Sequence, residues 1–272
     1  MLLIGVLVVG AFAVGTTAAW AVFHGGSGSA SPAATTTTSP VSTHHRQAKP
    51  ATTEVPATTE APATTQSPPK KHWTLKTVPA HLHLVSDLIP YGPKRRSEMA
   101  AYAARHYGVR TSVLHPKAIV LHFTASSTYE SAHSLFSEDV PSLGELPGTC
   151  SHYVVDQNGT VYEQAPPTIM CRHTIGLNDS AIGVEMVQVT GSGATWADRQ
   201  ILDRPAQINA ALLLVKWLQA VYGIPASAVV GHAMANDFRL FHDNEGWRND
   251  HTDWQAADVT AFRARLKTVR LR

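Results

Sequence analysis

Short apolar runs and longer amphipathic stretches alternate along the chain beyond about residue 73. The run Ala118–Thr124 is short, β-branched and uncharged, and it predicts a strand buried on both faces of a sheet. Asp156-Gln157-Asn158-Gly159 is a hairpin signal, so its flanks Ser151–Val155 and Thr160–Gln164 are expected to be strands. Two further strands are expected at Ala181–Val189 and Ala226–Val230.

Helical periodicity marks three other stretches. Ser97–Tyr107 predicts a helix, with Gly108 as its stop. Pro205–Tyr222 has the clearest pattern, with apolar positions 208, 211, 212, 215 and 218 on one face, and Ala256–Leu271 predicts a terminal helix. Strands mixed with packed helices predict an α/β or α+β domain, built around a single mixed β-sheet packed by helices.

The first 23 residues contain no charged side chain and are long enough to span a bilayer. They also contain Ala19-Trp20-Ala21, which resembles a signal peptidase site. Because the basic residues that open a signal peptide are missing, we favour an uncleaved transmembrane anchor over a cleaved signal segment. Either interpretation predicts that the rest of the chain is exported.

Residues 24–72 are rich in Thr, Pro and Ala, with a crude repeat, ATTEVPATTEAPATT, over 51–65. Such a segment cannot bury enough apolar area to offset its chain entropy, and it predicts a disordered linker. Residues 73–272 are then one globular domain of about 200 residues, which is long enough to bury a core.

Two histidines occur in apolar surroundings. His122 lies inside Ala118–Thr124, and His232 follows Val229-Val230-Gly231. Burying an imidazole costs free energy unless it finds a partner. Two histidines at strand ends, with the acidic segment 250–253 downstream, supply the three ligands that a catalytic zinc needs if one position stays open. The formal net charge of +2, in contrast, is too small to argue for nucleic acid binding.

Cys150 and Cys171 are the only cysteines of the chain. In an exported protein an even pair predicts one disulfide. Two free buried thiols, or a cysteine among the zinc ligands, are the alternatives.

Five segments, in order, resemble the zinc-dependent N-acetylmuramoyl-L-alanine amidases of the phage-lysozyme and peptidoglycan recognition protein type, the amidase-2 family. They are IVLHFTAS, CSHYVVDQNGTVYEQ, CRHTIGLNDSAIGVEM, VVGHAMAND and NDHTDW, between about Lys117 and Asp253. The resemblance implies an α/β fold, a Zn²⁺ cofactor and a monomer. It implies hydrolysis of the amide between N-acetylmuramic acid and L-alanine in peptidoglycan. The exported domain is then expected to face the cell wall, either membrane-anchored or secreted.

The resemblance also implies a ligand set. His122 and His232 match the first two zinc ligands, and Asp253 matches the third. The sequence departs from the family pattern at Trp254, where proline is usual, and this leaves Asp250 as a competing third ligand.

Two residues match catalytic positions of the family. Glu185 is a lone carboxylate among apolar strand residues, where a raised pKa suits a general base. A buried structural salt bridge is the alternative. His251 is expected to donate to the developing oxyanion or to protonate the leaving amine, and a solvent-facing loop histidine is its alternative.

Four residues are expected to bind substrate because they lie in segments that line the family's cleft: His152, Arg172, His173 and Asn178. For His152 a structural role is the alternative. Two rival functions remain for the whole domain. One is a peptidoglycan-binding module of the same fold without catalysis. The other is a zinc peptidase that cuts within the stem peptide, although no H-E-x-x-H motif is present.

Overall fold

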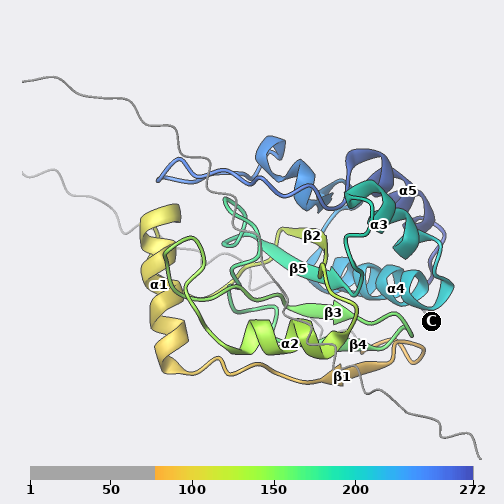
Figure 1. Ribbon diagram of the computed structural model, residues 1–272, viewed down its shortest axis with the longest axis horizontal. Coiled ribbons are helices and arrows are strands. Elements are labelled where there is room, and N and C mark those ends of the chain that lie inside the picture. Colours follow the sequence, from red (N-terminus) through yellow and green to blue (C-terminus); the bar gives the residue numbers. More distant parts are fainter. Residues whose placement is uncertain (1–76, 272) are drawn as a thin grey trace, which may run out of the picture. The chain divides into compact units, whose positions relative to one another are not determined.

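Six strands form a single sheet with helices on both faces in the computed structural model, which describes residues 77–271 (Figure 1). The predictions for the N-terminal segment and the linker lie outside the described residues. No helix within 77–271 is both long and apolar enough to cross a membrane.

The sheet is mixed. Its strand order is β1-β4-β3-β5-β2-β6, and every neighbouring pair is parallel except β3 and β4, which form the predicted hairpin. This confirms the predicted α/β fold. The strands are β1 (Leu84–Ser86), β2 (Ala118–Phe123), β3 (Tyr153–Val155), β4 (Val161–Glu163), β5 (Ala181–Met186) and β6 (Val229–Gly231).

Five α-helices and two short 3₁₀ helices accompany the sheet. Two of the α-helices end at glycines with a left-handed backbone, Gly108 at φ +72° and Gly223 at φ +70°, a conformation that costs glycine little. The helices are α1 (Pro93–Tyr107), α2 (Tyr129–Ser137), α3 (Ala194–Leu202), α4 (Pro205–Tyr222), α5 (Ala256–Leu266), η1 (Ala226–Ala228) and η2 (His232–Asp237).

The side chains of the strands pack into two separate hydrophobic cores, one on each face of the sheet. Val155 of β3 belongs to the larger core, together with Leu212 of α4. Val154 belongs to the smaller core, together with Phe136 of α2. Because successive side chains of a strand point to opposite faces, α4 and α2 cover opposite faces of the sheet (Figure 1).

Two helices, the strand β1 and several boundaries differ from the sequence predictions. Helices α2 and α3 were not predicted, because each has nine residues and too few apolar positions for a clear period. Strand β5 ends at Met186 instead of Val189, since both β2 and β3 end opposite Met186 and no partner remains. The expected strand at 226–230 begins at Val229, after the 3₁₀ turn η1. Helix α5 ends at Leu266, five residues before the predicted end.

Candidate metal centre and cleft

Three adjacent parallel strands bring the candidate residues to one edge of the sheet. His122 of β2 pairs in register with Glu185 of β5, so both side chains lie on the same face. On the other side of β2, Leu121 pairs with Gly231 of β6, and His232 follows directly. The carboxyl ends of β5, β2 and β6 therefore place two imidazoles and one carboxylate together, although they are far apart in sequence.

Asp253 completes a group of three donor atoms. His122 Nδ1 and His232 Nδ1 are 3.0 Å apart, and they lie 3.2 and 3.3 Å from the Asp253 carboxylate oxygens. All three side chains are buried, and they form a group that can hold one metal ion. Tetrahedral ligands at the usual zinc bond lengths of about 2.0–2.2 Å lie roughly 3.3 Å from one another. The spacing of the donor atoms therefore fits this metal.

The competing carboxylate, Asp250, lines the pocket beside His232 but is not part of the group of three donors. The Asp250 side chain is 100% exposed, and the Asp253 side chain is 8% exposed. Burial acts to raise the pKa of Asp253, but the neighbouring His122 and His232 outweigh it and hold that pKa below its ordinary range. Burial and the neighbouring His232 lower the pKa of His122 to about 4. A neutral imidazole beside an ionised carboxylate is the protonation state that metal ligation requires.

Outer hydrogen bonds orient both imidazoles. His232 Nε2 donates to Asn249 Oδ1 at 3.0 Å, which leaves its Nδ1 free to face Asp253. His173 Nε2 donates to the Ala181 carbonyl at 3.1 Å, so its Nδ1 is an acceptor. This Nδ1 lies 3.1 Å from His122 Nε2 and 2.8 Å from Thr174 Oγ1. Sequence reasoning missed Asn249, since an asparagine in a polar loop carries no signal of its own.

Glu185 lies beside the three metal-ligand candidates, and one of its carboxyl oxygens has no hydrogen-bond partner among the described residues. This oxygen, Oε2, is buried. Burial, and then the negative charge of Asp253, raise the pKa of Glu185 well above its ordinary value. The structural salt bridge considered as the alternative is absent from the described ion pairs of residues 77–271. Such a carboxyl group is available for proton transfer.

A pocket of about 140 Å³ opens beside His232, one of the three donor residues, and His251 also forms part of its wall. The His251 ring stacks on the His232 ring at 4.3 Å between centroids and 11° between planes. The His251 side chain remains 64% exposed. Burial, followed by the charge of His232, lowers the pKa of His251. Leu143, which is 68% exposed, lies at the same pocket.

Arg172 and Asn178 line the pocket, but their polar groups bond to the backbone of the protein itself. The buried Arg172 guanidinium donates to the carbonyl oxygens of Ser142, Glu145 and Pro147 at 2.7–2.9 Å. The Asn178 side-chain oxygen accepts from two backbone amides, those of His173 and Thr174. Their polar groups are thus used inside the protein, which differs from the substrate contacts expected of them.

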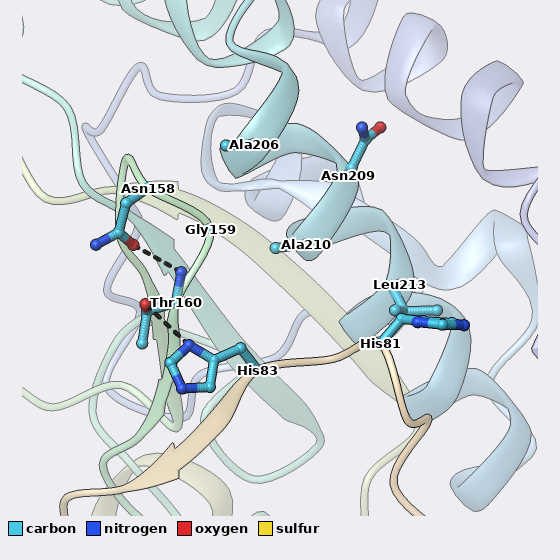
Figure 2. Close-up of a pocket in the computed structure, with 9 residues that line it drawn as sticks. All are labelled: His81, His83, Asn158, Gly159, Thr160, Ala206, Asn209, Ala210 and Leu213. Atoms are coloured by element: carbon cyan, nitrogen blue, oxygen red, sulfur yellow. Dashed lines mark hydrogen bonds between the residues drawn. The ribbon is translucent and has the colours of Figure 1, made fainter.

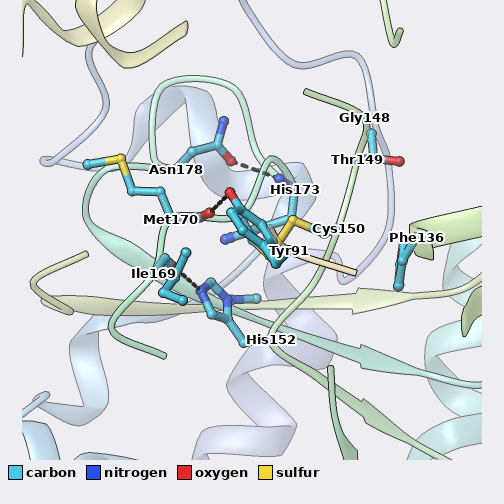
Figure 3. The surroundings of a disulfide bond; sticks show 12 residues. Tyr91, Phe136, Gly148, Thr149, Cys150, His152, Ile169, Met170, His173 and Asn178 are labelled. Atoms are coloured by element: carbon cyan, nitrogen blue, oxygen red, sulfur yellow. Dashed lines mark hydrogen bonds between the residues drawn. A yellow bond between two sulfur atoms is a disulfide. The ribbon is translucent and has the colours of Figure 1, made fainter. Parts of the chain in front are cut away.

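His152 does not reach the pocket, which corrects its expected contact with substrate. It is fully buried, and both ring nitrogens are occupied. Nε2 donates to the Ile169 carbonyl at 2.8 Å (Figure 3), and Nδ1 accepts from the Gly183 amide at 2.9 Å. Burial lowers the pKa of His152 to about 4. The structural role considered for this residue is the one that its contacts support.

The predicted disulfide is confirmed. Cys150 and Cys171 are bonded, with their Cα atoms 5.3 Å apart (Figure 3). Both cysteines are fully buried. The bond ties the segment before β3 to the segment that carries Arg172 and His173, and it removes both cysteines from the possible metal ligands.

A second hollow, of about 370 Å³, lies between the β3–β4 hairpin and the first turns of α4 (Figure 2). His81 and His83 line it, and His83 Nδ1 lies 3.2 Å from Thr160 Oγ1. No carboxylate or cysteine of residues 77–271 joins these two exposed histidines in the lining. The hollow therefore lacks the donor set found at the edge of β5, β2 and β6.

Comparison with known proteins points to one family. Amidase_2, described as N-acetylmuramoyl-L-alanine amidase, matches residues 112–254, which is just over half of the chain. The comparison with curated proteins gave no match.

Several solved structures are similar to the chain. A mutant endolysin from Bacillus subtilis is 21% identical over 56% of this chain and 84% of its own, with a TM-score of 0.38. The endolysin amidase LysCS from Clostridium intestinale is 19% identical over 54% and 83%, with a TM-score of 0.38. The amidase AmiD from E. coli is 25% identical over 44% and 49%, with a TM-score of 0.35.

Proposed function

Because the chain belongs to the Amidase_2 family of N-acetylmuramoyl-L-alanine amidases, we propose that His122, His232 and Asp253 hold the zinc ion of this activity. The chain is an N-acetylmuramoyl-L-alanine amidase that acts on peptidoglycan. The observation that carries the proposal for zinc is the convergence of three buried donor atoms spaced 3.0–3.3 Å apart.

The donor set suits zinc. Imidazole nitrogen and carboxylate oxygen are ordinary zinc ligands, and three protein ligands leave one position open for chemistry. Bound there, a zinc ion would supply positive charge that polarises the substrate carbonyl, favours ionisation of water and lowers the raised pKa of Glu185. Asn249 and His173 hold the two imidazoles with Nδ1 toward this point.

Glu185 is proposed as the general base. It takes a proton from the water whose oxygen attacks the carbonyl carbon between the lactyl group and L-alanine. The unpartnered Oε2 supports this role, since no other described group competes for it. When the carbon–nitrogen bond breaks, the same proton can pass to the leaving amine of L-alanine.

His251 is proposed as a donor to the reacting carbonyl oxygen. Its exposed ring lies on His232 at the wall of the pocket, where a substrate carbonyl near the three ligands would come within reach. An N–H that faces the oxygen as negative charge develops stabilises the transition state more than the ground state.

Mass spectrometry of digested peptidoglycan tests the proposal. We expect stem peptides with a free L-alanine amino terminus and glycan strands with a free lactyl carboxylate. Fragments cut within the stem peptide would indicate the rival peptidase. Binding to peptidoglycan without cleavage by the zinc-loaded protein would indicate the rival binding module.

Export is proposed from the sequence alone. The uncharged segment 1–23 supports a membrane anchor, and the linker 24–72 would let the domain reach the cell wall. Fractionation of cells followed by protease treatment of intact spheroplasts tests it. A full-length chain in the membrane fraction, cleaved from outside, supports the anchor, whereas a protected chain contradicts export.

A further inference from the structure

Trp254 occupies the position where the resemblance leads one to expect proline, and its backbone has a conformation that proline cannot adopt. Its φ is +55°, whereas a proline ring holds φ near −65°. Its backbone N–H donates to Asp198 Oδ1 at 3.0 Å, and proline has no such donor. The turn after Asp253 is therefore held by contacts of its own in this chain.

Trp254 touches the backbone beside all three proposed ligands. It follows Asp253 directly, and its indole N–H donates to the carbonyl oxygen of His122 at 3.1 Å. Its own carbonyl oxygen lies against Gly231, the residue before His232, where a Cβ atom would come within 1.8 Å of it. The Trp254 side chain is fully buried. One residue thus joins the strand ends of β2 and β6 to the loop that carries the carboxylate.

Asp198 of α3 binds the turn after Asp253 through hydrogen bonds to its backbone. Its two carboxylate oxygens accept from the backbone amides of Trp254 at 3.0 Å and Gln255 at 2.9 Å. Asp198 is fully buried, so both bonds are shielded from water. The Trp254 ring packs edge-on against Phe262 of α5, with 5.5 Å between centroids. The position of the Asp253 backbone is therefore set from α3, α5 and β2 together.

We infer that Trp254 and Asp198 are positioning residues that preorganise the metal centre by fixing the Asp253 turn against the ends of β2 and β6. The inference rests on the proposed metal site. Asp253 lies on a loop and the two histidines lie at strand ends. Beside the bond from the Ala233 backbone amide to the Asp253 carbonyl oxygen at 2.9 Å, the contacts of Trp254 and Asp198 hold this loop against the imidazoles. Groups that orient metal ligands in this way typically contribute about 10–100-fold to metal affinity.

The test is zinc affinity, measured by competition with a chromogenic chelator on the purified chain. Trp254→Phe removes the indole N–H, and Leu214→Ala is its control. Leu214 is fully buried in the same core, lies on α4 and makes no described bond to a ligand backbone. Asp198→Asn replaces one acceptor oxygen with a donor, and Asp258→Asn is its control. Asp258 is also buried, lies on α5 and makes no described bond to the 253–255 turn.

We expect Trp254→Phe and Asp198→Asn each to weaken zinc binding by about 10–100-fold. Both controls should retain the wild-type affinity, even where they lower the melting temperature of the metal-free protein as much. The visible spectrum of the cobalt-substituted protein should change in Trp254→Phe and stay unchanged in Leu214→Ala. If Trp254→Phe does not fold, the zinc affinity of Asp198→Asn alone tests the positioning role.

Two outcomes would overturn the inference, and they are distinguishable. Unchanged zinc affinity in Asp198→Asn and Trp254→Phe, with tight binding by the wild type, refutes the positioning role and leaves the proposed metal site standing. Equal weakening in variants and controls, in proportion to lost thermal stability, also refutes it, because the role would be general packing. A wild-type chain that binds no zinc instead refutes the metal site itself.

Discussion

Single atoms decide the chemistry of this site. The Glu185 carboxyl and the three donor atoms are all buried, but they differ in what they touch. The donors contact one another at 3.0–3.3 Å, while Glu185 Oε2 contacts no described partner. A buried polar group without a partner is costly, and one that persists at a site suits proton transfer.

Glu185→Gln should abolish hydrolysis and leave the metal in place. The amide is the same size as the carboxyl group but cannot accept a proton, and losing a general base typically costs about 10²–10⁴-fold in rate. Turnover on peptidoglycan and zinc content of the same preparation check this. Near-native turnover would contradict the role of Glu185, and loss of zinc would move it among the ligands.

Asp253→Ala and Asp250→Ala form a matched pair. Removing Asp253 takes the only carboxylate from the group of three, so zinc affinity should fall sharply. Removing Asp250, which is fully exposed, should leave the affinity nearly unchanged. Zinc titration of both variants measures the difference. The opposite order would assign the third ligand to Asp250 and would remove the argument for His251.

Secondary-structure elements set the shape of the cleft. Ser142 and Leu143, at the start of the segment 142–147, line the pocket, and a single side chain, Arg172, holds three carbonyl oxygens of that segment. The Cys150–Cys171 disulfide holds in place the segment that carries Arg172. Leu143 projects into solvent at the tip, with a left-handed φ of +52°. An exposed apolar side chain on a firmly held turn is suited to contact with substrate.

Arg172→Lys should loosen this wall. One ammonium group cannot replace a planar guanidinium that serves three carbonyls, so the unfolding free energy should fall by about 2 kcal/mol. KM should rise more than kcat falls, because the reacting groups keep their places. Steady-state kinetics and denaturant unfolding measure both effects. Arg199→Lys, at an exposed arginine, is the control and should change neither. Unchanged KM in Arg172→Lys would contradict a role for this wall in binding.

At the scale of the whole molecule, buried neutral histidines link stability to pH. His152 takes up a proton less readily in the folded chain, where its pKa is about 4, than in the unfolded chain, where the ordinary value is 6.5. Between these two values the unfolded state binds more protons. The stability linked to His152 is therefore fully present above about pH 6.5 and is lost as the pH falls toward 4.

His152→Gln should flatten this loss. The shift of the His152 pKa corresponds to about 3 kcal/mol at pH 4, so the stability of the variant should depend less on pH between 6.5 and 4 than that of the wild type. Urea unfolding at several pH values in this range provides the measurement. His81→Gln, at an exposed histidine, is the control. Parallel pH profiles for His152→Gln and the wild type would contradict the assignment.

The sequence by itself determined the parts that follow from periodicity and from motif order. A continuous apolar, β-branched run predicted β2, the turn residues 156–159 predicted the β3–β4 hairpin, and the helical pattern predicted both ends of α4. His122 lies near the end of β2 and His232 directly follows β6, so the two residues meet at one sheet edge if the strands are parallel neighbours, which they are. The family segments and the cysteine pair were likewise legible in the chain.

Only the tertiary structure decided where loop side chains point. Asp250 and Asp253 are three residues apart in one polar segment, and no periodicity distinguishes them. Asp253 is buried because the next residue, Trp254, is bonded to Asp198 and His122, more than 50 residues away. His152 and Arg172 resemble binding residues in sequence, but in the structure each donates hydrogen bonds to backbone carbonyl oxygens of other segments. Strand periodicity is local and can be read from the chain, whereas a loop conformation depends on partners that only folding brings together.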